Sequence, residues 1–251
     1  MTGMLASVAD LGEAELAAEL GADIVDLKDP STGALGAWQA GAIESAVARL
    51  GDRVTLSATV GDIPPDAAAI DAAVARIAAT GVDIVKVGLL PGGDDAGCLR
   101  ALSRHATAGV RLVLVWLADL SDSALNARDL ADAGLFGVML DTARKQHTGL
   151  RGCWRDAALA LFVDDARAQG LVTGLAGSLT IEDVTPLLAL EPDYLGFRGA
   201  LCAGGQRVAR LDHARFRGVR AVIPRQSPAS SRPTAAAGAQ SAARAATSGT
   251  A

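Results

Sequence analysis

The fold is decided by residues 21–36, GADIVDLKDPSTGALG, which combine a strand that looks buried with charges that such a strand normally avoids. Aliphatic strand formers lie between a glycine and a proline, and Asp26 and Lys28 alternate with them. Two residues spaced by two share one face of a strand. If both sides of the strand are covered, these charges must be paired with other groups or used in chemistry.

The same pattern recurs at the two other lysines of the chain. Lys86 lies in the apolar run GVDIVKVG, and Lys145 follows the run VMLDTAR, which also contains Asp141. Lys28, Lys86 and Lys145 are the only lysines among 23 basic residues, and all the others are arginines. A lysine can act as an amine nucleophile or as a neutral base, whereas an arginine cannot. Chance placement is the alternative, but the shared strand pattern favours a catalytic role.

Composition excludes several classes of protein. The 251 residues are 50% hydrophobic and only 3% aromatic, so the core must be built from alanine, valine, leucine and isoleucine. A formal net charge of -5 argues against a general nucleic-acid binder. No apolar run approaches the roughly 18 residues of a membrane helix and no signal sequence is evident, so we expect a cytoplasmic protein. Three scattered cysteines and three isolated histidines predict neither a disulfide framework nor a metal site, and we expect no cofactor.

Strand patterns alternate with helical ones along most of the chain. We expect strands within 21–36 and at 4–8, 54–62, 83–89, 110–117, 137–142, 171–178 and 194–199. We expect helices at 10–20, 38–50, 66–80, 95–107, 121–133, 154–169, 180–190 and 211–222. Alternation of this kind requires a parallel sheet covered on both faces, and eight repeats in this length favour a closed (β/α)₈ TIM barrel. We predict one barrel domain over 1–223 and a disordered low-complexity tail over 224–251.

Four charged residues fall at the late ends of the even-numbered strands: Lys28, Lys86, Asp141 and Arg198. In a barrel, alternate strands contribute side chains to one layer, and the active site lies at the carboxyl ends of the strands. We therefore expect one ring of these four groups at the barrel mouth, with a salt-bridged polar layer as the alternative. Neighbouring lysines lower each other's proton affinity, and a neutral lysine can form a Schiff base with a carbonyl. The pattern leaves open which lysine is the nucleophile.

The loops after the seventh and eighth strands carry the glycine-rich runs GLAGS and GFRG. Barrels commonly bind phosphate with backbone N–H groups at this place. The basic residues Arg207 and Arg210 follow in a glycine-rich segment, where they either close over an anionic substrate or are solvated surface charges. The expected phosphate-binding residues are Gly177, Ser178, Arg198 and Gly199.

The motifs DIVDLKDP, LSATVGD, VKVGL, MLDTA, LAGS and RG, in this order over about residues 4 to 222, resemble the (5-formylfuran-3-yl)methyl phosphate synthase family. The resemblance implies a lyase that condenses two molecules of glyceraldehyde 3-phosphate, with loss of phosphate and water, into a furan precursor of methanofuran. It implies that Lys28 forms the Schiff base and that Lys86 is the general acid/base. The remaining catalytic residues implied are Asp141, Lys145 and Asp26. The family's basic position after the cysteine is Ala203 here.

The sequence leaves two other functions open. One is a class I aldolase that uses the same lysines on a sugar phosphate and releases an aldol. The other is a non-catalytic sensor of a phosphorylated ligand. All three imply a small phosphorylated molecule as the partner, with no nucleic acid and no membrane, and the sequence leaves homo-oligomerisation undecided.

Overall fold

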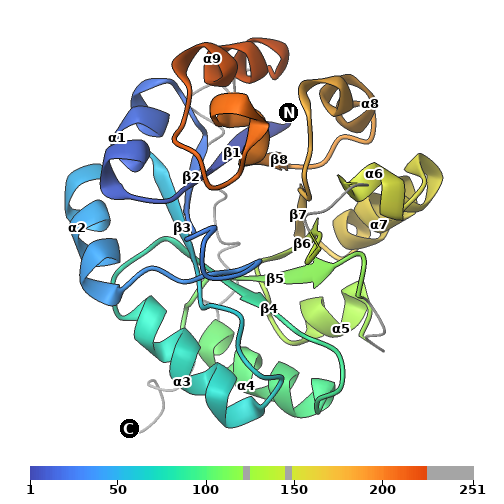
Figure 1. The fold of residues 1–251 in the computed structure, drawn as a ribbon. Helices are drawn as coiled ribbons and strands as arrows, with labels where there is room; N and C mark the ends of the chain where they lie inside the picture. The colour runs from blue at the N-terminus through green and yellow to red at the C-terminus, as the bar shows by residue number, and fades with distance from the viewer. Residues whose placement is uncertain (121–124, 145–148, 225–251) are drawn as a thin grey trace, which may run out of the picture.

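A closed barrel of eight parallel strands, β1 to β8 in sequence order, forms the centre of the molecule (Figure 1). The computed structural model describes residues 1–120, 125–144 and 149–224. The strands are β1 Gly3–Val8, β2 Ile24–Leu27, β3 Thr55–Thr59, β4 Ile84–Gly88, β5 Leu112–Leu117, β6 Gly137–Asp141, β7 Val172–Leu175 and β8 Tyr194–Phe197. The predicted TIM barrel is thus confirmed, and each expected strand is present.

Helices surround the barrel in a ring (Figure 1). The α-helices are α1 Leu11–Glu19, α2 Ala40–Leu50, α3 Ala67–Ala78, α4 Asp95–Thr107, α5 Ala127–Asp132, α6 Gly149–Cys153, α7 Asp156–Ala168, α8 Val184–Leu188 and α9 His213–Val222. Three 3₁₀ helices, η1 Ile181–Asp183, η2 Gly199–Leu201 and η3 Ala203–Gly205, lie in the loops after β7 and β8. No helix of the described residues is both long and apolar enough to cross a membrane.

Two helices differ from what the sequence predicted. The helix expected at 121–133 begins at Ala127, because the Asn126 side chain caps it and the Asp129 carboxylate accepts a hydrogen bond from the backbone N–H of Asn126. This capping box was not predicted from the sequence. Residues 121–124 of the expected helix lie outside the described residues, as do Lys145 and the tail from residue 225. The short helix α6 was not expected, since only Leu150 of its residues is buried and five residues show no apolar period.

The barrel interior changes from apolar to polar toward the carboxyl ends of the strands. Apolar side chains such as Leu5, Ile84, Val113, Met139 and Tyr194 form a core cluster of their own, separate from the one between strands and helices. Strand register then sets the polar layer, because inward-facing residues pair across neighbouring strands. The polar pairs are Ser7 with Asp26, Asp26 with Ser57, and Thr59 with Lys86.

Barrel closure places β8 beside β1 and brings α1 against the loop after β8. Glu13 of α1 is buried, and its carboxylate forms an ion pair with the guanidinium of Arg198. The same carboxylate accepts hydrogen bonds from the backbone N–H of Ala9 at 2.8 Å and of Leu211 at 3.0 Å. One side chain therefore ties the first helix to both ends of the 198–211 segment.

We predict that Glu13→Ala lowers the free energy of unfolding by about 3 to 5 kcal/mol, because it leaves Arg198 buried without its counter-ion. Glu15→Ala on the same helix is the matched control. Its ion pair with Arg49 is exposed, so the loss there should be within about 1 kcal/mol. Urea denaturation of both variants measures the difference, and equal losses would contradict the structural role of Glu13.

Candidate active site

A fully buried ion pair lies inside the barrel. Lys86 Nζ is 3.0 Å from Asp26 Oδ1, and the two residues are 2% and 0% exposed. The hydroxyl of Ser57 donates to Asp26 Oδ1 at 2.6 Å, and that of Ser7 donates to Oδ2 at 2.9 Å. Both carboxylate oxygens thus have partners, which is the condition under which a buried charge is tolerated.

Charges near this pair shift both of its pKa values. Burial opposes the charged form of Asp26, but Lys86, Lys28 and the Ser57 hydrogen bond outweigh it and hold the pKa of Asp26 below its usual value. Burial also disfavours the ammonium of Lys86 and lowers its pKa, and the positive charge of Lys28 acts in the same direction. Asp26 opposes this shift only in part. Lys86 therefore loses its proton more easily than a surface lysine.

A second pair lies above the first, at the barrel mouth. Lys28 Nζ is 3.3 Å from Asp141 Oδ2, and Asp141 Oδ1 accepts the N–H of Thr142 at 2.7 Å. Lys28 and Asp141 both line a cavity of about 690 Å³, whereas neither residue of the Asp26–Lys86 pair does. Of the two described lysines, Lys28 is thus the one that a ligand in this cavity can reach. The sequence had left this choice open.

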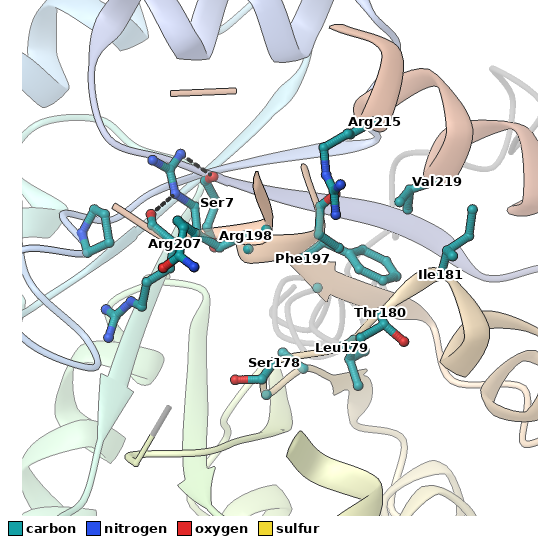
Figure 2. Close-up of a pocket in the computed structure, with 18 of the residues that line it drawn as sticks. Ser7, Ser178, Leu179, Thr180, Ile181, Phe197, Arg198, Arg207, Arg215 and Val219 are labelled. Carbon is teal, nitrogen blue, oxygen red and sulfur yellow. Dashed lines mark hydrogen bonds between the residues drawn. The ribbon is translucent and has the colours of Figure 1, made fainter. Parts of the chain in front are cut away.

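The cavity lies between the loops after β7 and β8 (Figure 2). Gly177 and Ser178 line it from the first loop, and both have left-handed backbone conformations, with φ of 112° and 51°. At Gly177 a Cβ atom would lie 2.9 Å from the side chain and 3.1 Å from the backbone nitrogen of Thr142, and φ is positive, so glycine is favoured there. An exposed serine with positive φ is unusual, and such strain is frequent at ligand sites. Gly199 opens helix η2 on the other side, where its N–H has no partner within the helix.

Arg198 does not complete the expected ring of four charges. Its guanidinium donates to Glu13 and to the carbonyl oxygens of Ser7, Arg207 and Ala209. These contacts occupy all five N–H donors of an arginine. The structure therefore brings together Lys28 with Asp141 and Lys86 with Asp26, while Arg198 supports the loop after β8. A phosphate contact by Arg198 would have to displace one of these acceptors.

Several residues of the site escaped the sequence reading. Glu13 lies three positions after the cap Asp10, where a glutamate usually serves only the helix end. Ser7 and Ser57 could have been found, since each is a hydroxyl at an inward position of an apolar strand. Arg215, on the first turn of α9, lines the cavity from a position that resembles an ordinary solvated charge. No cluster of three or more metal-ligating side chains occurs in the described part of the chain.

The chain matches a known family over almost the whole barrel. A family model described as 4-HFC-P synthase matches residues 4–220. A Methylorubrum extorquens protein, named provisionally as a (5-formylfuran-3-yl)methyl phosphate synthase, is 42% identical over 212 residues, which cover 84% of this chain and 87% of the relative. The (5-formylfuran-3-yl)methyl phosphate synthase of Methanocaldococcus jannaschii is 34% identical over 219 residues, covering 81% of this chain and 92% of the relative.

Solved structures agree on the fold. A 3-hexulose-6-phosphate synthase superposes with a TM-score of 0.63 at 19% identity, covering 88% of this chain and 100% of that chain. The phosphoribosyl anthranilate isomerase of Thermus thermophilus superposes with a TM-score of 0.60 at 17% identity, covering 88% of this chain and 98% of that chain. At these identities the likeness concerns the barrel alone.

We predict that Lys86 titrates below 10.5, the usual lysine pKa, because burial disfavours its charge. Asp26→Asn should lower this pKa further, since Asp26 favours the charged lysine. In the wild-type protein, Lys86 is protonated to a greater extent in the unfolded chain than in the native one when the pH lies between the native Lys86 pKa and 10.5. The contribution of Lys86 to the free energy of unfolding therefore increases as pH rises through that interval.

Lysine-selective ¹³C labelling and an NMR pH titration test this directly, since the chain has only three lysines. Loss of one signal in Lys86→Arg assigns the resonance. A Lys86 that titrates at or above 10.5 would contradict the electrostatic account.

Proposed function

Because the chain belongs to the 4-HFC-P synthase family, we propose that it condenses two molecules of glyceraldehyde 3-phosphate into (5-formylfuran-3-yl)methyl phosphate. The chain is an enzyme, and the proposed reaction makes it a lyase that forms a methanofuran precursor. Two triose phosphates balance against one furan phosphate, one inorganic phosphate and two water molecules. No external oxidant or reductant is needed.

The position of Lys28 is the observation that carries this proposal. Its amine lies on the cavity wall beside Asp141, where an aldehyde can approach it. A neutral lysine amine adds to an aldehyde and loses water to form an imine. The imine then draws electrons from the neighbouring carbon, so that a proton can leave that carbon and a carbon–carbon bond can form. Lys28 is thus assigned as the nucleophile.

The Asp26–Lys86 pair, which lies deeper in the barrel than Lys28, is assigned to proton transfer. Lys86 and Lys28 are close enough for their charges to interact, and like charges disfavour the protonated state of a lysine. The lowered pKa of Lys86 lets it release and take up a proton more readily than a surface lysine, and we assign it as the general acid/base. Asp26 and its two serine donors hold the Lys86 ammonium in position.

Asp141 is assigned to orient Lys28 and to assist proton transfer at the imine, since its carboxylate lies 3.3 Å from Lys28 Nζ. Lys145 is assigned an assisting role from the family motif alone, because it lies outside the described residues. Loss of phosphate and water after carbon–carbon bond formation leads to the aromatic furan, whose stability draws the sequence of steps forward.

One substrate phosphate is assigned to the loops after β7 and β8. Gly177, Ser178 and Gly199 line the cavity there, and backbone N–H groups of such loops suit phosphate oxygens. Arg198 was expected to bind the same phosphate directly. Its contacts favour an indirect role, in which it fixes the loop that carries Gly199.

We predict that Lys28→Arg lowers turnover of glyceraldehyde 3-phosphate by on the order of a thousandfold or more, because the charge is kept and the nucleophile is lost. Near-ultraviolet absorbance and mass spectrometry detect the furan, and a phosphate assay should count one phosphate per furan. Arg100→Lys, an exchange at an exposed site, is the control and should keep full activity.

The product distinguishes this function from its competitors. A wild-type enzyme that consumes the triose phosphate and yields an aldol without near-ultraviolet absorbance would indicate an aldolase instead. Full furan synthesis by Lys28→Arg would remove Lys28 from the mechanism.

A further inference from the structure

Arg207 projects into the cavity with most of its hydrogen-bonding capacity unused. It follows η3 in the loop after β8 and lines the same cavity as Lys28 and Asp141. Its Nη2 donates to the carbonyl oxygen of Gly33 at 2.7 Å. A guanidinium has five N–H donors. In the part of the chain that the structure describes, the other four have no protein acceptor.

The contrast with Arg198, nine residues earlier in the same loop, is informative. Arg198 is ion-paired with Glu13, and every one of its donors is used. Arg207 is also partly buried, yet no carboxylate of the described residues forms an ion pair with it. Burial lowers the pKa of Arg207, and the negative charges of Asp141, Asp62 and Asp29 offset this only in part. Arg207 is therefore a cation on the cavity wall that has no direct ion-pair partner among the described residues.

The side chain of Arg207 reaches the loop after β2, on a different side of the cavity from Gly177 and Ser178. In Figure 2 Arg207 lies at the left, Ser178 at the lower centre and Arg215 at the upper right. The Arg207 side chain contacts the loop after β2 through its hydrogen bond to Gly33. The cavity volume of about 690 Å³ lies within the range that accommodates drug-sized ligands, and a triose phosphate is much smaller than these. There is room for two such molecules in one cavity.

We propose that Arg207 binds the phosphate group of the second triose phosphate, on the side of the cavity next to the loop after β2, while the first phosphate lies at Gly177 and Ser178. This inference rests on the proposed function, in which two dianionic substrates must be held near Lys28 at the same time. A planar guanidinium can donate two parallel hydrogen bonds to a phosphate, which fixes the orientation of the substrate as well as its place. Arg207 thus determines the arrangement of the second substrate and takes no part in proton transfer.

The test compares Arg207→Gln with Arg210→Gln, an exposed arginine of the same loop outside the cavity lining. Calorimetric titration with inorganic phosphate at low salt should show that Arg207→Gln removes one of two bound phosphates or weakens it at least about tenfold. Arg210→Gln should bind like the wild type. In steady-state assays, Arg207→Gln should raise the KM for glyceraldehyde 3-phosphate by a similar factor with a smaller change in kcat, and Arg207→Lys should restore part of it.

The two kinds of readout separate the inference from the function on which it rests. Phosphate binding and KM that are both unchanged in Arg207→Gln would overturn the inference while leaving the furan synthase intact. Loss of a bound phosphate in Arg207→Gln, with no furan from the wild type, would keep the anion position and remove the proposed reaction. Thermal unfolding checks that all variants are folded. Partial recovery in Arg207→Lys, which keeps the positive charge, would show that the loss in Arg207→Gln comes from the missing charge and not from a general loss of structure.

Discussion

The site depends on a carboxylate buried inside the barrel. Asp26 has no exposed surface, and its charge is tolerated only because Lys86, Ser57 and Ser7 surround both oxygens. Asp26 and these three partners come from four different strands, so the cluster fixes the relative positions of β1 to β4 on the inward side. Lys28 then lies above the pair on the same face of β2, at the point where the barrel opens into the cavity.

The layered arrangement gives the two lysines different environments. Lys86 is enclosed and held by a carboxylate, whereas Lys28 meets Asp141 at the cavity wall. A buried amine with a lowered pKa and a reachable amine beside it are the two components that imine chemistry needs, one for proton transfer and one for attack. The arginines after β8 are divided in the same way, since Arg198 holds the loop and Arg207 faces the cavity.

Much of this could be predicted from the sequence, for identifiable reasons. The period of alternation gives the barrel, and the even spacing of Asp26 and Lys28 places both charges on the inward face. The sequence did not predict which charged groups pair with one another. The predicted single ring was wrong because Lys86 lies deeper in the barrel than Lys28 and because Arg198 pairs with the buried Glu13. Glu13 is on a helix, where a glutamate is usually solvated. Such partners depend on barrel closure, which brings together residues 185 positions apart.

Borohydride trapping tests the central claim, that Lys28 is the amine that attacks the substrate, most directly. Reduction in the presence of glyceraldehyde 3-phosphate converts an imine into a stable secondary amine, and peptide mass spectrometry locates it. The account predicts a three-carbon phosphate adduct on the peptide that contains Lys28, which disappears when arginine replaces that lysine. An adduct confined to Lys86, or no adduct on any lysine of the wild-type enzyme, would contradict it.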